Sequence, residues 1–407
     1  MSKSLRRCVV GSIVLAASSV FANRAIAGGI EVPMQGAKAA GQADAFTAQA
    51  DDPSAIFYNP AGLTQLKGTQ ISAGLYFLQP AYHFEGDDGR DERMELPTYL
   101  PHFYAVSDFG LDKWRFGIGI NNPFGINEDF GDGGSFRSIV DDAQLMCINI
   151  APTVAYQVNP NFSLGLAFNT YVGSALLTRH VPLGGGAEGE FHFRGEDVSF
   201  GVTPGVLWKI DERNTIGAYY RSPFSLNFDG DAKVDFAGTN VVGPSDTKAN
   251  LHFPQSVGVG YAFRPTPDLK LEADVIWTDW HAVKNLMFDS SNPAFNGQKI
   301  PANWDSGFTY RLGVEYLLDK HWALRTGYAY GQNAVPNSTF NPLVPDSNYH
   351  LGAVGIGYST ERWSFDVAAN LIYRETHHVE GSVNSPLVDG DWGNLMYGVM
   401  ATLTFKL

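Results

Sequence analysis

From residue 69 to the C-terminus, apolar side chains alternate with polar or small ones, residue by residue. In the segment 162–169, Phe, Leu, Leu and Phe alternate with Ser, Gly, Ala and Asn. The same pattern recurs at 116–121, 269–278, 310–318, 363–371 and 397–407. A period of two residues puts the apolar side chains on one face of a β-strand. The chain is therefore expected to form a sheet with one apolar face and one polar face.

The connections between these segments alternate in length. Short turns fall at 108–113, 158–161, 210–213, 264–268, 318–321 and 359–362. Long polar segments lie near 81–96, 123–142, 179–192, 227–249, 280–305, 332–346 and 377–392. Short turns at one end and long loops at the other are typical of outer-membrane barrels, as is an even strand number. The pattern predicts a transmembrane antiparallel β-barrel over residues 69–407, with about fourteen strands.

The first residues have the features of an export signal. Lys3, Arg6 and Arg7 precede an apolar run at 9–21, and Ala25-Ile26-Ala27 fits a cleavage site. Residues 1–27 are therefore interpreted as a signal peptide. They hold four basic residues and no acidic one, so their removal changes the formal charge from −14 to −14 − 4 = −18. An acidic mature chain argues against nucleic acid as a partner.

Composition separates the possible classes further. Charged residues make up 17% of the chain, against about a quarter in soluble proteins, while aromatic residues reach 13%. A soluble β-sandwich also alternates, but its polar face usually carries more Lys and Glu. The acidic loops at 86–92 and 129–142 lack the ligand spacing of an EF-hand, so neither a metal nor another cofactor is expected. Serines near His350, His377 and His378 have no nucleophile motif around them, and we expect no enzyme.

Residues 28–68 precede the first predicted strand and do not alternate. Within them, residues 51–54 (DDPS) can cap a short helix, and Asn59, Pro60, Ala61 and Gly62 are expected to stop it. A compact segment rich in Ala and Gly would suit a plug inside the barrel. A loose periplasmic tail is the alternative, as is an ordinary helix and turn for residues 51–66.

Motifs along the whole mature chain carry a resemblance to a known family. They are DDPS (51–54), NPAG (59–62), YYRSP (219–223), NWD (303–305), YRLG (310–313) and WALRTGYAY (322–330), followed by Val335-Pro336 and Pro345-Asp346. Together they resemble the outer-membrane long-chain fatty acid transporters of FadL type, which include relatives that take up aromatic hydrocarbons.

The resemblance implies a fourteen-stranded barrel closed by an N-terminal hatch that contains the Asn59-Pro60-Ala61 triplet. It implies passive uptake of a hydrophobic compound, long-chain fatty acids first and aromatic or aliphatic hydrocarbons as the alternative. Such a compound binds in the lumen and leaves sideways through an opening where a strand kinks. The expected setting is the outer membrane of a Gram-negative bacterium, with the chain a monomer among outer-membrane lipids and lipopolysaccharide. A hydrophilic diffusion porin is the rival, although it would lack the N-terminal plug.

The third predicted strand, near 116–125, is the candidate for the kink. Gly117 and Gly119 weaken a strand and Pro123 lacks an amide donor, so pairing is expected to fail at Asn121 and Asn122. We hypothesise that this gap faces the Asn59-Pro60-Ala61 triplet. The alternative is a strand that simply runs into its loop.

Candidate substrate contacts are of two kinds. Arg311 and Arg325 lie mid-strand on the polar face, Arg221 lies near the outer rim, and each could bind a carboxylate head group. Alternatively, they pair with lumenal carboxylates, for which the candidates are Glu272, Asp274, Glu315 and Asp366. Phe124, Phe130 and Leu183 are candidates for apolar capture from the loops, with ordinary loop packing as the alternative.

Overall fold

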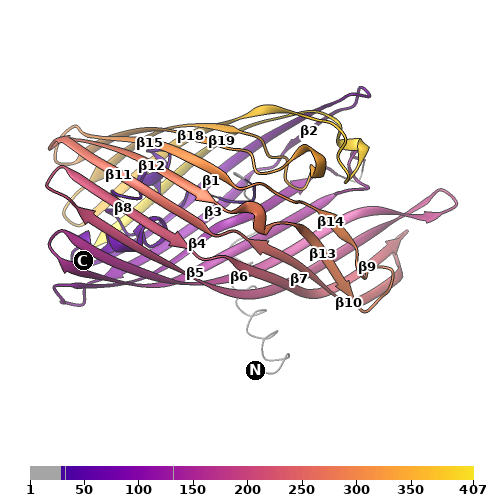
Figure 1. The fold of residues 1–407 in the computed structure, drawn as a ribbon, viewed down its shortest axis with the longest axis horizontal. Helices are drawn as coiled ribbons and strands as arrows, with labels where there is room; N and C mark the ends of the chain where they lie inside the picture. Colours follow the sequence, from indigo (N-terminus) through magenta and orange to yellow (C-terminus); the bar gives the residue numbers. More distant parts are fainter. Residues whose placement is uncertain (1–28, 33, 132) are drawn as a thin grey trace.

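The computed structural model describes residues 29–32, 34–131 and 133–407, so the predicted signal peptide 1–27 lies outside the described residues. Fourteen antiparallel strands form a closed barrel, which confirms the predicted fold class (Figure 1). The wall strands are β1 (Thr69–Gly86), β3 (Thr98–Ser107), β4 (Trp114–Asp129), β5 (Asp142–Asn159), β6 (Phe162–Gly184), β7 (Ala187–Lys209), β8 (Asn214–Arg221), β11 (Ser256–Thr266), β12 (Leu269–Thr278), β15 (Gly307–Leu317), β16 (Trp322–Gly331), β17 (Tyr349–Ser359), β18 (Trp363–Val379) and β19 (Gly390–Lys406).

The first and last strands close the barrel by pairing over their whole length, from Gln70 with Lys406 to Gly86 with Gly390. β8 pairs directly with β11, across the insertion of two further strands. These are β9 (Phe224–Phe236) and β10 (Thr239–Phe253). Three further strands also belong to the long connections: β2 (Asp91–Glu95), β13 (Asn285–Ser290) and β14 (Lys299–Pro301). We call the end of the barrel that carries these extra strands the loop end. The opposite end, where the C-terminus lies, is the turn end (Figure 1).

Alternation along each wall strand separates an outer apolar face from the lumen. On β15, Leu312 is 58% exposed while its neighbours Arg311 and Gly313 are buried. On β19, the outward side chains Leu395, Tyr397 and Val399 are exposed and the residues between them are buried. Exposed apolar side chains on a closed barrel are placed to meet lipid. Among the described residues, no helix is long and apolar enough to cross a membrane.

Three segments predicted as long loops are instead mostly strand. Residues 81–96 form much of the β1–β2 hairpin, 179–192 the tip of the β6–β7 hairpin, and 227–249 most of the β9–β10 hairpin. Their sequences lack a clear apolar face because strands beyond the membrane do not need one face for lipid. The tip of the β9–β10 hairpin is Ala237-Gly238, where both residues adopt a left-handed conformation.

Residues 29–32 and 34–66, hereafter the hatch, lie inside the barrel toward the turn end (Figure 1). The hatch contains the short helices α2 (Ala37–Ala40) and α3 (Ala55–Tyr58) and the 3-10 helix η1 (Pro60–Gln65). α3 ends one residue before Asn59, whose Oδ1 accepts a hydrogen bond from Ala61 N at 3.2 Å and so begins η1. Further 3-10 turns lie in the loops, at η2 (Trp280–Ala282), η3 (Asn337–Thr339) and η4 (Pro386–Val388).

Wall glycines let the hatch backbone approach closely. A Cβ atom added at Gly165 would lie 2.2 Å from Ala61 N, and one at Gly205 would lie 2.3 Å from Asn59 Oδ1. At Gly217 the added atom would lie 2.2 Å from a hatch carbonyl oxygen, that of Thr47. The hatch therefore occupies space that exists only because these wall positions have no side chain.

Candidate functional site

The wall has a discontinuity at β4. β4 pairs with β3 only over residues 116–120, so residues 98–102 of β3 have no β4 partner. On its other side, the β4–β5 register shifts between Asn121 and Phe124, where β4 gains one residue over its partner. A bulge bends its strand and interrupts the ladder. The irregularity falls at the predicted Asn121-Asn122-Pro123 position. Beyond Ile120, toward the loop end, β3 and β4 are therefore not paired, and we call this unpaired border the β3–β4 seam.

The first part of the hatch lies along this seam. Val32 N donates to Pro123 O at 2.8 Å, and Gly125 N donates to Ile30 O at 3.0 Å. The Gln35 amide exchanges hydrogen bonds with the backbone of Asn122. Asn122 Nδ2 in turn donates to Pro101 O of β3 at 2.9 Å, which bridges the seam. Residues 30–35 thus take the place of a strand partner for the kinked part of β4.

The Asn59-Pro60-Ala61 triplet does not hold this position, which corrects the hypothesis that the gap faces it. Asn59 Nδ2 donates to Thr47 O within the hatch and to Val206 O of β7. Pro60 and Ala61 pack on Gly205 and Gly165, away from the seam. The hatch residue that contacts β4 from α3 is Ile56, whose side chain fills the space beside Gly117 and Gly119.

Two buried carboxylates on β12 anchor the middle of the hatch. Asp274 Oδ2 accepts hydrogen bonds from Phe46 N and Thr47 N, both at 3.0 Å. Glu272 accepts from the next two amides, Ala48 N at 2.6 Å and Gln49 N at 2.9 Å. The sequence offered these carboxylates as arginine partners, but they bind four consecutive hatch amides. The four amides, which would otherwise be buried without an acceptor, are thus satisfied by β12.

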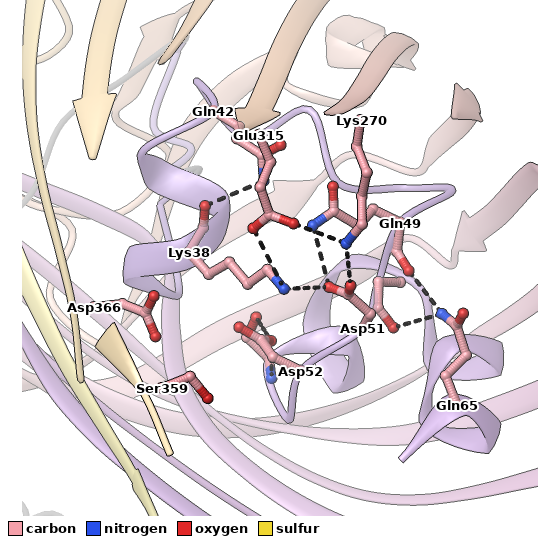
Figure 2. A network of polar contacts seen from close by, with 12 residues as sticks. Lys38, Gln42, Gln49, Asp51, Asp52, Gln65, Lys270, Glu315, Ser359 and Asp366 are labelled. Atoms are coloured by element: carbon pink, nitrogen blue, oxygen red, sulfur yellow. Dashed lines mark hydrogen bonds and ion pairs between the residues drawn. The ribbon is translucent and has the colours of Figure 1, made fainter. Parts of the chain in front are cut away.

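A network of ion pairs ties the hatch to β12 and β15 (Figure 2). Lys38 and Lys270 each bind Asp51 at 2.8 Å, and Lys270 also binds Glu315 at 2.8 Å. Burial disfavours a charged Lys38, but Asp51 and Glu315 outweigh that effect and raise its pKa. Burial likewise disfavours a charged Asp51, but Lys270 and Lys38 prevail and lower the pKa of Asp51. The network therefore stays ionised.

Two hatch carboxylates outside these pairs behave differently. Burial raises the pKa of Asp44 to about 6, against a lowering effect of Arg311 and of a hydrogen bond from Tyr58. Burial also raises the pKa of Asp52 to about 6, although Lys38 lies nearby. Asp52 Oδ1 accepts from Ser54 N at 2.8 Å and so orders the residues before α3. Both groups bind protons in a range where the network remains charged.

The three arginine candidates have different surroundings. Arg325 pairs with Glu315 and with Asp366, each at 2.7 Å, so its charge is neutralised and it is not a free head-group site. Arg221 donates to Phe57 O and lies over the Phe57 ring at 4.3 Å. The first is a structural ion pair on the lumen wall, and the second fixes α3.

Arg311 is buried and binds only a backbone carbonyl by hydrogen bond, that of Asp44 at 3.2 Å. Within the described part of the chain, no carboxylate lies within ion-pair distance of its guanidinium. Arg311 also lines a small cavity of about 20 Å³. Its remaining lining residues are Glu31, Ile276, Thr278, Trp280, Gly307, Phe308, Thr309, Gln332 and Tyr349. Arg311 is therefore the one of the three candidates without a close carboxylate contact or aromatic stacking, although its charge also acts on Asp44.

A second cavity, of about 90 Å³, is apolar and lies toward the loop end. It is lined by Ile30, Ile126, Leu251, Val283, Leu286, Ile300, Pro301, Ala302, Trp304, Val335, Thr339, Asn341, Leu343 and Val344. The two cavities are neighbours, since Trp280 of the first and Trp304 of the second have ring centroids 5.3 Å apart. The hatch contributes to both cavities, because Glu31 lines the first and its neighbour Ile30 lines the second.

Arg374 and Asp346 were not predicted as site residues. They form a fully buried ion pair, and Asp346 Oδ2 accepts hydrogen bonds from Gly29 N and Ala334 N. The pair therefore joins the start of the hatch to the loop at 332–346. Arg374 lies on the polar face of an alternating segment, which is the signal that could have identified it.

The capture candidates also differ. Phe124 is 3% exposed and packs on Phe253 at 5.0 Å in an interior aromatic cluster, so it is not a surface capture residue. Phe130 is half-buried against Phe136 at 5.2 Å. Leu183 is exposed near the tip of the β6–β7 hairpin. For Phe130 and Leu183 a capture role stays a prediction. Among the described residues, no group of three His, Cys, Asp or Glu side chains could hold a metal ion.

Comparison with known proteins gives one consistent result. The chain is 26% identical over 370 residues to a long-chain fatty acid transport protein of Escherichia coli O6:H1, covering 80% of this chain and 82% of that protein. Its fold is similar to the crystal structure of a Pseudomonas aeruginosa FadL homologue, with a TM-score of 0.84, 20% identity, and 93% and 99% of the two chains covered. It is also similar to the Pseudomonas putida toluene transporter TodX, with a TM-score of 0.73, 17% identity, and 94% and 100% covered.

A family model described as outer membrane protein transport protein (OMPP1/FadL/TodX) matches residues 18–394. This match covers nearly the whole barrel and the hatch, and it agrees with a Gram-negative outer-membrane location and uptake of hydrophobic compounds. The chain belongs to the OMPP1/FadL/TodX family of outer-membrane transport proteins.

Proposed function

We propose that the protein takes up long-chain fatty acids, with the carboxylate head group bound at Arg311 and the chain in the apolar cavity. The observation that carries this proposal is the pairing of the two cavities. One presents an arginine that has no carboxylate within ion-pair distance in the described part of the chain, and the neighbouring one is lined mainly by aliphatic and aromatic side chains. A buried guanidinium binds a carboxylate by charge-assisted hydrogen bonds, and the chain gains about 0.8 kcal/mol for each buried CH₂.

Glu31 is the residue with which a substrate carboxylate would compete for this cavity. Its side chain lines the Arg311 cavity, where it stands near the position that a substrate carboxylate would take. Among the described residues its ion pair is with Arg221 at 3.9 Å, a long contact. A substrate can therefore compete with Glu31 without breaking a short ion pair.

The test is binding of radiolabelled oleate and toluene to purified protein in detergent. Arg311→Gln is expected to weaken oleate binding about tenfold or more, because one charge-assisted contact is lost. The matched control is Arg194→Gln. Arg194 is exposed on β7 and lines neither cavity, so this variant should bind oleate normally. Equal oleate binding by Arg311→Gln and the wild type would refute the head-group assignment.

Uptake of monoaromatic hydrocarbons is the second candidate. It is favoured by the aromatic pair Trp280–Trp304 and by an apolar cavity whose lining includes no charged side chain. Saturable toluene binding that both arginine variants retain, with no specific oleate binding, would select this function. Binding of neither ligand would refute both proposals.

For the exit we propose the β3–β4 seam above Ile120. The short ladder, the β4 bulge and the hatch residues along them support a lateral opening toward lipid. An exit into lipid keeps an apolar chain out of water. The outward apolar faces of the wall supply that lipid contact, and because one chain encloses the whole lumen, we propose that it works as a monomer within the lipid and lipopolysaccharide of the outer membrane.

A disulfide staple tests this exit. The pair Pro101→Cys and Asn122→Cys spans the seam, where Asn122 now contacts Pro101. Oxidation is expected to reduce oleate uptake into vesicles severalfold, and reduction to restore it. The control pair, Ala105→Cys and Ile118→Cys, joins residues that already face each other in the ladder. Full uptake through the oxidised seam would exclude this route.

A further inference from the structure

A third cavity, of about 300 Å³, opens at the turn end between the hatch and the ends of β7, β8, β11 and β12. Its lining includes Lys209, Arg213, Arg264 and Lys270 from the wall, with Gln49 and Asp51 from the hatch. Three of these residues, Gln49, Asp51 and Lys270, belong to the polar network in Figure 2. The cavity therefore reaches the network from the side opposite the apolar cavity.

Most of the cationic charge in this cavity is not matched by a bonded carboxylate. Lys270 is held by Asp51 and Glu315, but among the described residues no ion pair or side-chain hydrogen bond joins Lys209, Arg213 or Arg264 to a partner. Lys209 is half-buried at the end of β7, which sets it apart from a fully solvated lysine.

The carboxylates that line the cavity are already engaged or exposed. Asp51 binds Lys38 and Lys270. Asp211 accepts hydrogen bonds from Arg213 N at 2.7 Å and Asn214 N at 2.9 Å, and so closes its own turn. Glu212 points to solvent. Four cationic and three anionic side chains give the lining a charge of 4 − 3 = +1, in a chain whose total is −14.

One further polar atom bears on the ligand. Gln49 donates its amide to Asp51, while its Oε1 atom is buried without a hydrogen-bond donor in the described structure. A buried acceptor without a donor is costly, so a ligand or water that donates a hydrogen bond there is favoured. A phosphate that carries an O–H group can supply this donor, whereas an ionised carboxylate would bind through the cationic side chains alone.

The turn end faces the periplasm, because the short turns of outer-membrane barrels lie on that side. We propose that this cavity is an oxyanion site, which takes a carboxylate or a phosphate group between Lys209 and Arg264. The site is separate from the Arg311 cavity and does not depend on which hydrophobic compound is transported. An anion bound there also lies beside Lys270, where it competes with Asp51 for the lysine. Occupancy would therefore weaken the tie between the hatch and the wall from the periplasmic side.

The experiment is calorimetric titration of the mature protein, in a non-ionic detergent at low ionic strength, with inorganic phosphate and separately with hexanoate. Low salt is needed because the Debye length falls to about 10 Å at 0.1 M ionic strength, which weakens the attraction between the anion and the cationic side chains. Saturable binding with one site per chain is expected. Lys209→Gln and Arg264→Gln should each weaken it about tenfold, from the loss of one charged contact.

Lys113→Gln is the matched control, since Lys113 lies in the 108–113 turn at the same end and is exposed outside the cavity. Binding that survives Lys113→Gln but not the two cavity variants supports the site, and its preference for phosphate or hexanoate identifies the oxyanion. Absence of saturable binding for both ions would overturn the proposal. An equal loss in Lys113→Gln would also overturn it, since general charge attraction would then account for the binding. Oleate binding through Arg311 can succeed or fail independently of these outcomes.

Discussion

The hatch holds to the wall in two different ways along its length. Residues 30–35, hereafter the seam segment, contact β4 through hydrogen bonds between neutral groups, namely backbone amides, carbonyls and the Gln35 side chain. Residues 44–51, hereafter the anchor segment, bind through buried carboxylates and the ion-pair network. Neutral hydrogen bonds contribute about 0.5–1.5 kcal/mol each, and those to charged groups about 1.5–3 kcal/mol.

This difference assigns different tasks to the two segments. The seam segment lies where a hydrophobic compound would leave the barrel, and its neutral bonds can be exchanged at small cost. The anchor segment lies toward the turn end, where a loosened hatch would let water-soluble compounds through. The seam segment can therefore detach from β4 while the anchor segment stays bound to the wall at the turn end. Four changes to the chain test this contrast, beginning with the largest expected effect.

The largest effect is expected from Arg325→Ala. Its removal takes away the ion-pair partner of Asp366 and leaves Glu315 with its lysines, and loss of one partner from a buried ion pair costs about 3–5 kcal/mol. The free energy of unfolding in urea should fall by that amount. The exposed Arg213→Ala should leave it unchanged. Equal stability of Arg325→Ala and the wild type would show that the network does not hold the anchor segment.

The next effect concerns pH and Asp44. Its pKa is raised from 3.8 to about 6, so the folded protein binds the proton more tightly than the unfolded chain does. The stability contribution of Asp44 is full below about pH 4, and it is lost as the pH rises to about 6. Asp44→Asn should remove this pH dependence, on the order of 3 kcal/mol.

The measurement is the free energy of unfolding at about pH 4 and about pH 7, with the exposed Asp268→Asn as the control. The wild type and Asp268→Asn should lose the same amount of stability between the two pH values. Asp44→Asn should lose less. If the three proteins change in parallel, Asp44 is not the group that titrates.

Glu272→Ala tests the anchor segment directly. It leaves Ala48 N and Gln49 N buried without their acceptor, while relief of repulsion with Asp274 offsets part of the loss. We expect a net cost of about 2 kcal/mol, and a raised permeability of liposomes to small sugars. The exposed Glu212→Ala should stay impermeable. Unchanged permeability in Glu272→Ala would mean that these amides do not keep the lumen closed.

The smallest effect is expected from Asn122→Ala, which removes the bridge to Pro101 O at the seam. Global stability should fall by about 1 kcal/mol or less. Hydrogen exchange should become faster at Val32 and Gly125, and it should stay the same at the amides of residues 46–49. Faster exchange at both segments would contradict the separation between them.

Much of this architecture could be predicted from the sequence, because a lipid-facing barrel imposes alternation on every wall strand. The strand number and the position of the β4 irregularity followed from that pattern and from Pro123, which cannot donate to a ladder. The loop-end hairpins could not be found in this way, since strands outside the membrane need no apolar face.

Contacts inside the lumen were harder to predict than the wall. Arg311 and Arg325 both lie on the polar face of their strands, and only the positions of Glu315 and Asp366 distinguish the paired arginine from the available one. Likewise, the NPA triplet is visible in the sequence, but its contact with β6 and β7 depends on how the hatch is folded. Which of several similar polar residues pair depends on the tertiary structure, and the local sequence does not determine it.

The wall glycines have a consequence for how such a chain can vary. At Gly165, Gly205 and Gly217 even a methyl group would overlap the hatch backbone. A mutation there would act on the plug although it lies in the wall, and it would be tolerated only if the plug moved or was lost. A map of which wall glycines accept alanine would therefore trace the outline of the hatch on the inside of the barrel, without any structure of the variants.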